Sequence, residues 1–422
     1  MKLFDIRSGV LTVLVAGIFT ANLTVIATAA SYIHDLDCNM LSLALAVLSV
    51  YLWKRYEKGF LYGMLPLCLS IGLYQSYISV AITLVILYLV MELLDGEPFC
   101  AVFQKGLKSI AMIIGAGVLY FIALKIICYV TDVSIKSGRY NSIDTVLSMS
   151  IPRILYRVIE GYIRSCDEIL HAASVYPEKV ILLVHVLMIA VSGGIILCRV
   201  LQKEIKIKEK LLTLVLIVLL PLGMNIVYPI TDGRSHVLME FGFWLTYLFT
   251  LLIAWWAVRH FGAWKPLLKH GQRFAAVCLV LLVLWGNVQT ANAAYLKKDL
   301  EQQANLSLFT RIVYQMERCD GYVTGETPVV FVGTPVALLD TVPGLEEIQD
   351  IIGCESPLTL FRNVRARYRA YFDYILLNPA VMADTEIWTK LQSDSTVAQM
   401  PCYPQEGCMA IIDGILVVKL GE

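Results

Sequence analysis

Charged residues are scarce in this sequence. They make up 16% of its 422 residues, whereas a typical soluble domain has about 25%. Apolar residues reach 58%, and the mean hydropathy is +0.69. A chain of this composition cannot expose most of its surface to water, which excludes an ordinary cytosolic enzyme or nucleic-acid-binding protein. The 34 basic and 34 acidic residues cancel, so the net charge indicates no partner.

The sequence also lacks the common catalytic and ligand-binding motifs. It contains no Gly-rich phosphate loop, no HExxH, no CxxC and no GxSxG. We expect no metal site and no cofactor, and a divalent-metal requirement stays open. The tail holds four cysteines, an even number that permits disulfides in an oxidising compartment, and Cys402 and Cys408 are spaced to close a short loop.

Long apolar runs account for most of the chain. A run of about 20 apolar residues can cross a bilayer as a helix. Such runs lie at 9–30, 40–53, 60–94, 107–130, 180–198, 211–230, 237–258 and 274–293. As one helix, 60–94 would extend about 52 Å, too far for a hydrocarbon core of about 30 Å. Its centre around Tyr74 and Gln75 is polar and aromatic, so we predict two helices that meet there, and nine spans in all.

The basic residues indicate the orientation of these spans. With the N-terminus inside, the inner segments carry 16 Lys and Arg residues, and the short outer turns carry only Arg234. A single pass through 60–94 would invert every later loop and remove this asymmetry. The first run also resembles a signal peptide, with Lys2 and Arg7 before it and an Ala-Thr-Ala sequence at its end, but its length favours an uncleaved helix.

Two outer segments are long. We predict a transmembrane domain over residues 1–293, with an external loop at 131–179, and an extracytoplasmic mixed α/β domain over 294–422. In the loop, charged residues recur every three or four positions over 151–171, which predicts an amphipathic helix at the membrane interface. Both a solvated helix face and a lid over a lipid-exposed substrate site fit this pattern.

The tail combines helical and strand patterns. Residues 296–318 and 358–376 have helical periodicity, and 329–333 form a short apolar run that ends at a glycine. The last residues predict a hairpin that turns at Asp413 and Gly414. The chain is therefore predicted to be an α-helical polytopic integral membrane protein with a C-terminal α/β domain.

Polar residues gather at the predicted outer ends of the spans. The candidates are Asp35 and Asp37 as catalytic carboxylates, and Tyr74, Gln75, Arg139, Tyr140, Asp232 and Arg234 as substrate-binding residues. A carboxylate can act as a general base toward a sugar hydroxyl, and an arginine can hold a phosphate through two hydrogen bonds. Tyrosine and glutamine can bind sugar hydroxyls. The alternative, that short outer turns are simply polar, stays open for these residues.

Three stretches occur in an order that matches a known family. They are Asp37 followed by Met40-Leu41-Ser42-Leu43-Ala44, then Leu69 through Tyr77 with Gly72-Leu73-Tyr74-Gln75 at its centre, and finally Met400-Pro401 through Gly407 with Asp413-Gly414 through Leu420. These stretches resemble the Gtr-type bacterial glucosyltransferases, polytopic enzymes that add glucose to O-antigen. The resemblance implies a GT-C-type fold and a polyprenyl-phosphate-linked sugar donor at the outer side of the inner membrane. It implies a surface polysaccharide such as lipopolysaccharide O-antigen as acceptor, contact with membrane lipid, and no nucleic-acid partner.

The sequence departs from the family in one place. In the family, an acidic pair with Gly-Arg and Trp elements precedes the matched region. In this sequence, Asp35 and Asp37 lack that context. The family's catalytic acid is therefore carried onto no residue, and a shortened inactive homologue stays open. So do a lipid-linked-glycan flippase or transporter, for which internal repeats and charged span centres would be expected, and a glycan polymerase or ligase.

Overall fold

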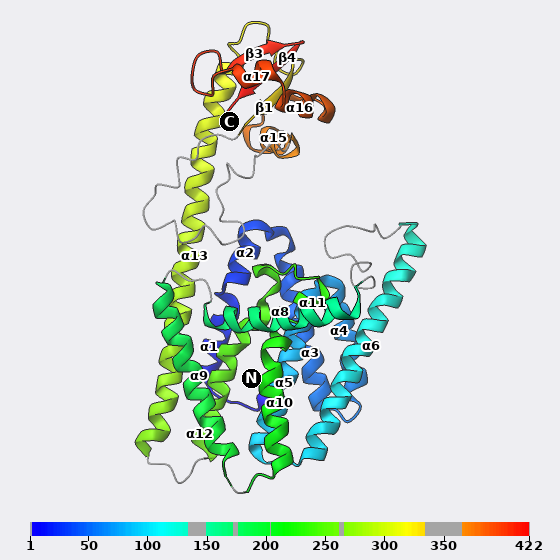
Figure 1. Ribbon diagram of the computed structural model, residues 1–422, viewed down its shortest axis with the longest axis vertical. Coiled ribbons are helices and arrows are strands. Elements are labelled where there is room, and N and C mark those ends of the chain that lie inside the picture. Colours follow the sequence, from blue (N-terminus) through cyan, green and yellow to red (C-terminus); the bar gives the residue numbers. More distant parts are fainter. Residues whose placement is uncertain are drawn as a thin grey trace. The chain divides into compact units, whose positions relative to one another are not determined.

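The chain divides into two compact units, Met1–Ala291 and Asn292–Glu422 (Figure 1). The computed structural model describes residues 2–133, 149–171, 176–202, 204–260, 266–333 and 365–421, without the side chains of 266–269. The unit boundary falls two residues before the domain boundary predicted after residue 293. The predicted site residues Arg139 and Tyr140 lie outside the described residues.

The first apolar run is two helices instead of one. After the short turn η1 (Lys2–Phe4), α1 (Gly9–Thr20) and α2 (Leu23–Ser31) are bent by 42° at a two-residue break. Asn22 explains the break. Its Nδ2 donates to two carbonyl groups in the last turn of α1 (2.9 and 3.0 Å), and its Oδ1 accepts from the amide of Val25 at 3.0 Å. One buried side chain thus ends α1 and caps α2.

The break predicted near Tyr74 is confirmed. Here α4 (Gly59–Leu73) ends, Tyr74 is extended, and α5 (Ile78–Asp95) begins after the short turn η3 (Gln75–Tyr77). The extended backbone of Tyr74, with φ of −154°, cannot continue a helix.

The other elements of the first unit correspond to the predicted runs, two of which are divided: 211–230 at residues 225–226, and 237–258 at residue 240. They are η2 (Ile33–Asp35), α3 (Leu36–Arg55), α6 (Phe99–Thr131), α8 (Ile151–Leu170), α9 (Glu178–Val200), α10 (Ile207–Met224), α11 (Val227–Ile230), η4 (Val237–Met239), η5 (Phe241–Trp244), α12 (Leu245–His260) and the start of α13 (Pro266–Met316). The predicted helices at 274–293 and 296–318 are one continuous α13, because no glycine or proline separates them.

Six described helices are long and apolar enough to cross a membrane. They are Ile33–Arg55, Gln75–Asp95, Phe99–Thr131, Glu178–Val200, Phe241–His260 and His270–Met316, and the bent pair of α1 and α2 makes a seventh if it counts as one span. The chain is therefore a polytopic α-helical membrane protein. The predicted count of nine also requires α4, with only 15 residues, and α10, which begins with three charged residues in its first four. That count stays a prediction.

The predicted amphipathic helix is confirmed as α8, and it lies across the spans, against α10 and α11 (Figure 1). Its buried side is narrow and consists of the small residues Gly161 and Ser165. A Cβ at position 161 would lie only 3.0 Å from the Tyr228 ring, so glycine permits this close approach. Large apolar side chains remain exposed on another side, among them Leu155, Ile159 and Ile163 at 59–63%. An amphipathic helix with an exposed apolar side is typical of a membrane interface.

The second unit is built on a four-stranded sheet of order β2-β1-β4-β3. The strands are β1 (Pro328–Val332), β2 (Val381–Met382), β3 (Met409–Ile412) and β4 (Ile415–Lys419). The predicted hairpin of β3 and β4 is confirmed, with left-handed residues Asp413 and Gly414 in its turn. The helices are the end of α13, α15 (Arg365–Tyr371), η7 (Phe372–Leu376), α16 (Thr385–Gln392) and α17 (Ser395–Gln399).

The core of this unit is aromatic. Phe331 of the central strand is fully buried and stacks on Tyr368 of α15 at 4.5 Å between ring centroids. Cys402 and Cys408, whose pairing the sequence left open, are free thiols in the structure.

Candidate active site

A cavity of about 490 Å³ lies where α2, α3 and α4 meet the segment after α11. We call it the Asp35 cavity. It is lined by Thr28, Tyr32, Asp35, Cys38, Asn39, Gly72, Leu73, Tyr74, His236, Leu238 and Met239. The structure thus brings together Asp35 and Tyr74, which the sequence proposed as catalytic and substrate-binding residues, although 38 positions separate them.

Asp35 supplies the one carboxylate among the described residues that line this cavity. It ends the turn η2 just before α3, where the chain redirects and its side chain stays about half exposed. Its Oδ2 lies 3.3 Å from Nε2 of His34, and its backbone carbonyl accepts from Nδ2 of Asn39 at 2.9 Å. The carboxylate is therefore both anchored locally and open to the cavity.

Two other predicted residues lie beside the cavity without lining it. Asp37 is exposed, and its Oδ1 accepts from the amide of Cys38 at 2.7 Å. Gln75 is also exposed, and its Nε2 donates to the hydroxyl of Tyr120 on α6 at 3.0 Å. The structure therefore separates the two aspartates: the family-like stretch of the sequence contains Asp37, whereas Asp35 is the one that lines the cavity.

Asp232 is buried in an ion-pair cluster with α8. Its Oδ1 accepts from Nε of Arg153 at 2.9 Å and from Nε of Arg157 at 2.8 Å, and Arg153 also contacts Oδ2. These hydrogen bonds, led by those from Arg153 and Arg157, hold the pKa of the Asp232 carboxyl below its usual range. Asp232 and Gly233 are left-handed, and a Cβ on Gly233 would come within 2.8 Å of the Arg157 guanidinium. The carboxylate proposed to bind substrate is thus occupied by two arginines.

A second buried carboxylate, Glu240, also faces α8. Its Oε1 accepts from the Ser235 hydroxyl at 3.2 Å and lies 3.6 Å from Arg164, which is equally far from Glu168. Burial, and then the nearby Glu168 carboxylate, raises the pKa of Glu240 to about 7. The sequence analysis missed Glu240 because it lies within the apolar run 237–258. An ionisable residue in such a run was the signal that could have identified it.

One short segment connects this cluster to the Asp35 cavity. We call residues 231–240 the cavity loop. Asp232 and Glu240 at its two ends pair with α8, while His236, Leu238 and Met239 between them line the cavity.

The cavity loop is also fixed to α2. The Thr24 hydroxyl donates to the carbonyl of Val237 at 2.9 Å, and Nε1 of Trp244 lies 3.1 Å from the same hydroxyl. Arg234, the predicted phosphate ligand, is an exposed residue of this loop, two positions before His236. The loop is thus held from two sides, and the position of α8 affects one wall of the cavity.

In the part of the chain that the structure describes, no three His, Cys, Asp or Glu side chains group as a metal site. The comparisons with known proteins bear on the first unit. The family described as Glucosyl transferase GtrII matches residues 1–253, more than half of the chain. The chain belongs to this family. No curated protein and no solved structure matches it.

This GtrII-family chain is therefore a membrane glucosyltransferase, as the Gtr-type resemblance indicated. The matched region includes the Asp35 cavity, the cavity loop and α8. It ends within α12, before the α/β unit.

Proposed function

We propose that this chain transfers glucose from a polyprenyl-phosphate-linked donor to a surface polysaccharide such as O-antigen, at the outer face of the cytoplasmic membrane. The observation that carries the proposal is the Asp35 cavity, where a carboxylate stands among polar groups at the end of membrane-spanning helices. Its volume of about 490 Å³ is within the range of about 300–1,000 Å³ common for small-molecule sites.

The proposed reaction needs a general base, side chains that bind the sugar, and a cation that stabilises the negative charge of the leaving phosphate. Asp35 takes the proton from the acceptor hydroxyl, whose oxygen forms a bond to the anomeric carbon of glucose. The bond from that carbon to the phosphate oxygen breaks, and polyprenyl phosphate leaves as an anion. Tyr74 and Asn39 bind sugar hydroxyls, and Arg234 on the cavity loop stabilises the phosphate of the leaving group.

The distribution of charge supports the proposed side of the membrane. Asp35 lies just before the start of α3, whereas the other end of this helix carries Lys54 and Arg55. Because cytoplasmic segments are enriched in Lys and Arg, the end of α3 beside Asp35 is proposed to face outward. In this orientation the N-terminus is cytoplasmic and the α/β unit is extracytoplasmic.

Asp35→Asn tests the proposal, with Asp37→Asn as its matched control. Loss of a general base lowers turnover by roughly 10²- to 10⁴-fold. The measurement is transfer of radiolabelled glucose from synthetic polyprenyl-phosphate glucose to purified O-antigen by the full chain in detergent. We expect this loss for Asp35→Asn and near-normal transfer for Asp37→Asn. Normal turnover by Asp35→Asn would remove Asp35 from the chemistry.

The outward position has a separate test that uses two exposed thiols of the chain. Cys38 lines the Asp35 cavity. Cys100 lies in the first turn of α6, which follows the C-terminal end of α5 after a few residues. In variants that keep only one of these cysteines, a membrane-impermeant maleimide added to intact cells is expected to label Cys38 and to leave Cys100 unlabelled until lysis. Labelling of Cys100 in intact cells would reverse the proposed orientation.

A further inference from the structure

A second polar cavity, of about 420 Å³, lies at the other end of α3 from Asp35. We call it the Arg7 cavity. Its lining contains four cationic side chains, those of Lys2, Arg7, Lys54 and Arg55, and one carboxylate, that of Asp5. The cavity therefore carries a large excess of positive charge, which favours an anionic ligand.

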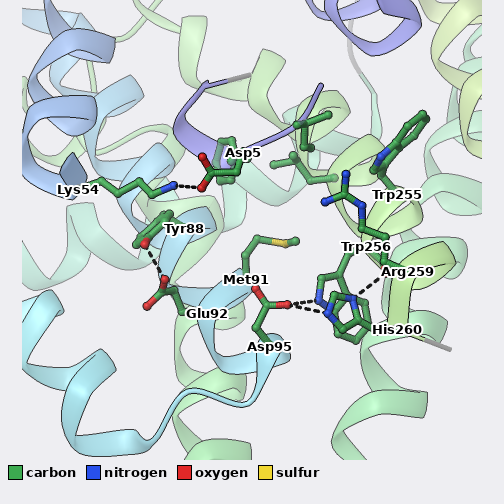
Figure 2. Close-up of a pocket in the computed structure, with 13 residues that line it drawn as sticks. Asp5, Lys54, Tyr88, Met91, Glu92, Asp95, Trp255, Trp256, Arg259 and His260 are labelled. Atoms are coloured by element: carbon green, nitrogen blue, oxygen red, sulfur yellow. Dashed lines mark hydrogen bonds and ion pairs between the residues drawn. The ribbon is translucent and has the colours of Figure 1, made fainter. Parts of the chain in front are cut away.

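The single carboxylate neutralises only one of these cations. Lys54 is mostly buried, contacts Asp5, and donates to the carbonyl of Leu3 at 2.8 Å. Figure 2 shows this Asp5–Lys54 pair in the wall shared with a smaller neighbouring cavity of about 170 Å³. Within the described ranges, no carboxylate lies within ion-pair distance of Arg7 or Arg55. These two guanidinium groups remain available to a ligand.

The carboxylates of the neighbouring cavity do not compensate this charge, because each has its own partner (Figure 2). Glu92 accepts from the hydroxyl of Tyr88 and pairs with Lys105. Asp95 accepts from Nε1 of Trp256 at 2.6 Å and lies 3.3 Å from His260.

The α3 surface that runs from the Arg7 cavity toward the Asp35 end of the helix is apolar and exposed. Leu41 and Leu48 are 52% and 41% exposed, and they stand at intervals of seven residues from each other and from Arg55. Residues seven apart lie on one face of a helix, and Tyr51, which lines the cavity, is on that face too. A ligand with a charged head in the cavity would thus find an apolar stripe for attached chains.

We propose that the Arg7 cavity binds the phosphate headgroup of an anionic phospholipid, with the acyl chains along the Leu41–Leu48 face of α3. Arg7 and Arg55 hold the phosphate oxygens, and the Asp5–Lys54 pair shapes the wall. In the orientation proposed above, this cavity lies at the cytoplasmic face, where basic pockets between helices bind anionic lipid headgroups. The site is independent of the Asp35 cavity, which lies at the opposite end of α3.

The test is phosphatidylglycerol binding to the purified full chain, measured by native mass spectrometry after exchange into a neutral detergent. Each cation near an anionic lipid contributes roughly 1 kcal/mol, so Arg7→Gln/Arg55→Gln is expected to weaken binding by at least about tenfold. Both side chains are exposed, so the double variant is expected to fold, which its thermal unfolding and gel-filtration profile verify.

The matched control is Lys206→Gln/Lys208→Gln, which removes two exposed cations at the start of α10, outside the lining of the cavity. It is expected to change binding by less than about twofold. Equal losses in both double variants would show only general attraction and overturn the site. Soluble glycerol 3-phosphate is expected not to compete at the concentration at which phosphatidylglycerol saturates. Equal competition would overturn the lipid as the source of the phosphate.

Discussion

Arg157 of α8 donates from Nε to Oδ1 of Asp232 at 2.8 Å, which ties the amphipathic helix to the cavity loop. Asp232 is 7% exposed and Arg157 is 22% exposed, so water screens this pair weakly. The same loop carries His236 into the Asp35 cavity. A helix with an exposed apolar side is thus coupled to the wall of the candidate active site through one buried carboxylate.

The first prediction concerns this pair. A double-mutant cycle with Arg157→Ala and Asp232→Ala is expected to give a coupling energy of about 2 kcal/mol, because the two groups are hydrogen-bonded and largely shielded from water. Asp232→Ala is also expected to raise the KM for the lipid-linked donor severalfold more than it lowers kcat, because it moves the cavity wall and leaves Asp35 in place. Chemical unfolding and initial-rate kinetics measure the two effects.

The control for this cycle is Arg153→Ala with Asp232→Ala. Arg153 is 55% exposed, so its coupling to Asp232 is expected to be the smaller of the two. A coupling near zero for Arg157 would show that the Arg157–Asp232 pair does not hold α8 against the cavity loop.

Asn22 gives the second prediction, on the bend between α1 and α2. Asn22→Leu keeps the branched shape of the side chain but removes its three hydrogen bonds to the backbone. The variant is expected to lower the free energy of unfolding by about 2 kcal/mol, from the lost N-cap and the unpaired backbone groups. Thermal unfolding in detergent measures this loss. Asn39→Leu, at a site where the side chain donates a hydrogen bond to the carbonyl of Asp35, is the control, and an equal loss there would contradict the assignment.

How far the sequence predicts this protein depends on the range of the interaction. Helices α3 to α6 and α8, the break at Tyr74 and the β3–β4 hairpin were predictable because each depends on local periodicity or on a turn sequence. The bend at Asn22 was not predicted, although its cause is local, because an apolar run of that length fits one straight span. The sheet order also escaped prediction, since β1 pairs with strands more than 50 residues later.

The candidate site shows the same division. Asp35 and Tyr74 were identified as polar residues at span ends, but nothing in the sequence favoured Asp35 over Asp37, since that choice depends on which side chain faces the cavity. The role of Asp232 was missed because its partners Arg153 and Arg157 are more than 70 residues away. Glu240 was missed because it lies within an apolar run, and its partner Arg164 comes from α8.

The third prediction concerns the core of the α/β unit. Phe331 is fully buried against Tyr368 and Phe372, so Phe331→Ala is expected to destabilise this unit by about 3–5 kcal/mol, and Phe331→Leu by less. Hydrogen exchange on the full chain measures it as faster exchange in β1 and β4. Tyr374→Ala removes a 79% exposed ring and serves as the control. Unchanged exchange in Phe331→Ala would contradict the proposed core.

The last prediction is a pH dependence that belongs to Glu240. Its pKa is raised from 4.5 to about 7 in the folded protein, so the folded state binds a proton more tightly than the unfolded state. The resulting stabilisation is fully present below pH 4.5 and is lost as the pH rises through about 7. The charged groups that face Glu240 are Arg164 and Glu168 of α8, and Glu168 opposes its ionisation.

Glu240→Gln keeps the shape of the side chain but removes its charge at every pH. Relative to the wild type, this variant is therefore expected to be more stable at about pH 8 than at about pH 5, measured as the difference in unfolding temperature at each pH. Glu97→Gln, at an exposed carboxylate between α5 and α6, serves as the control and is expected to show no such trend. If Glu240→Gln instead loses stability as the pH rises, the attraction of Arg164 outweighs burial, and Glu240 is ionised throughout this range.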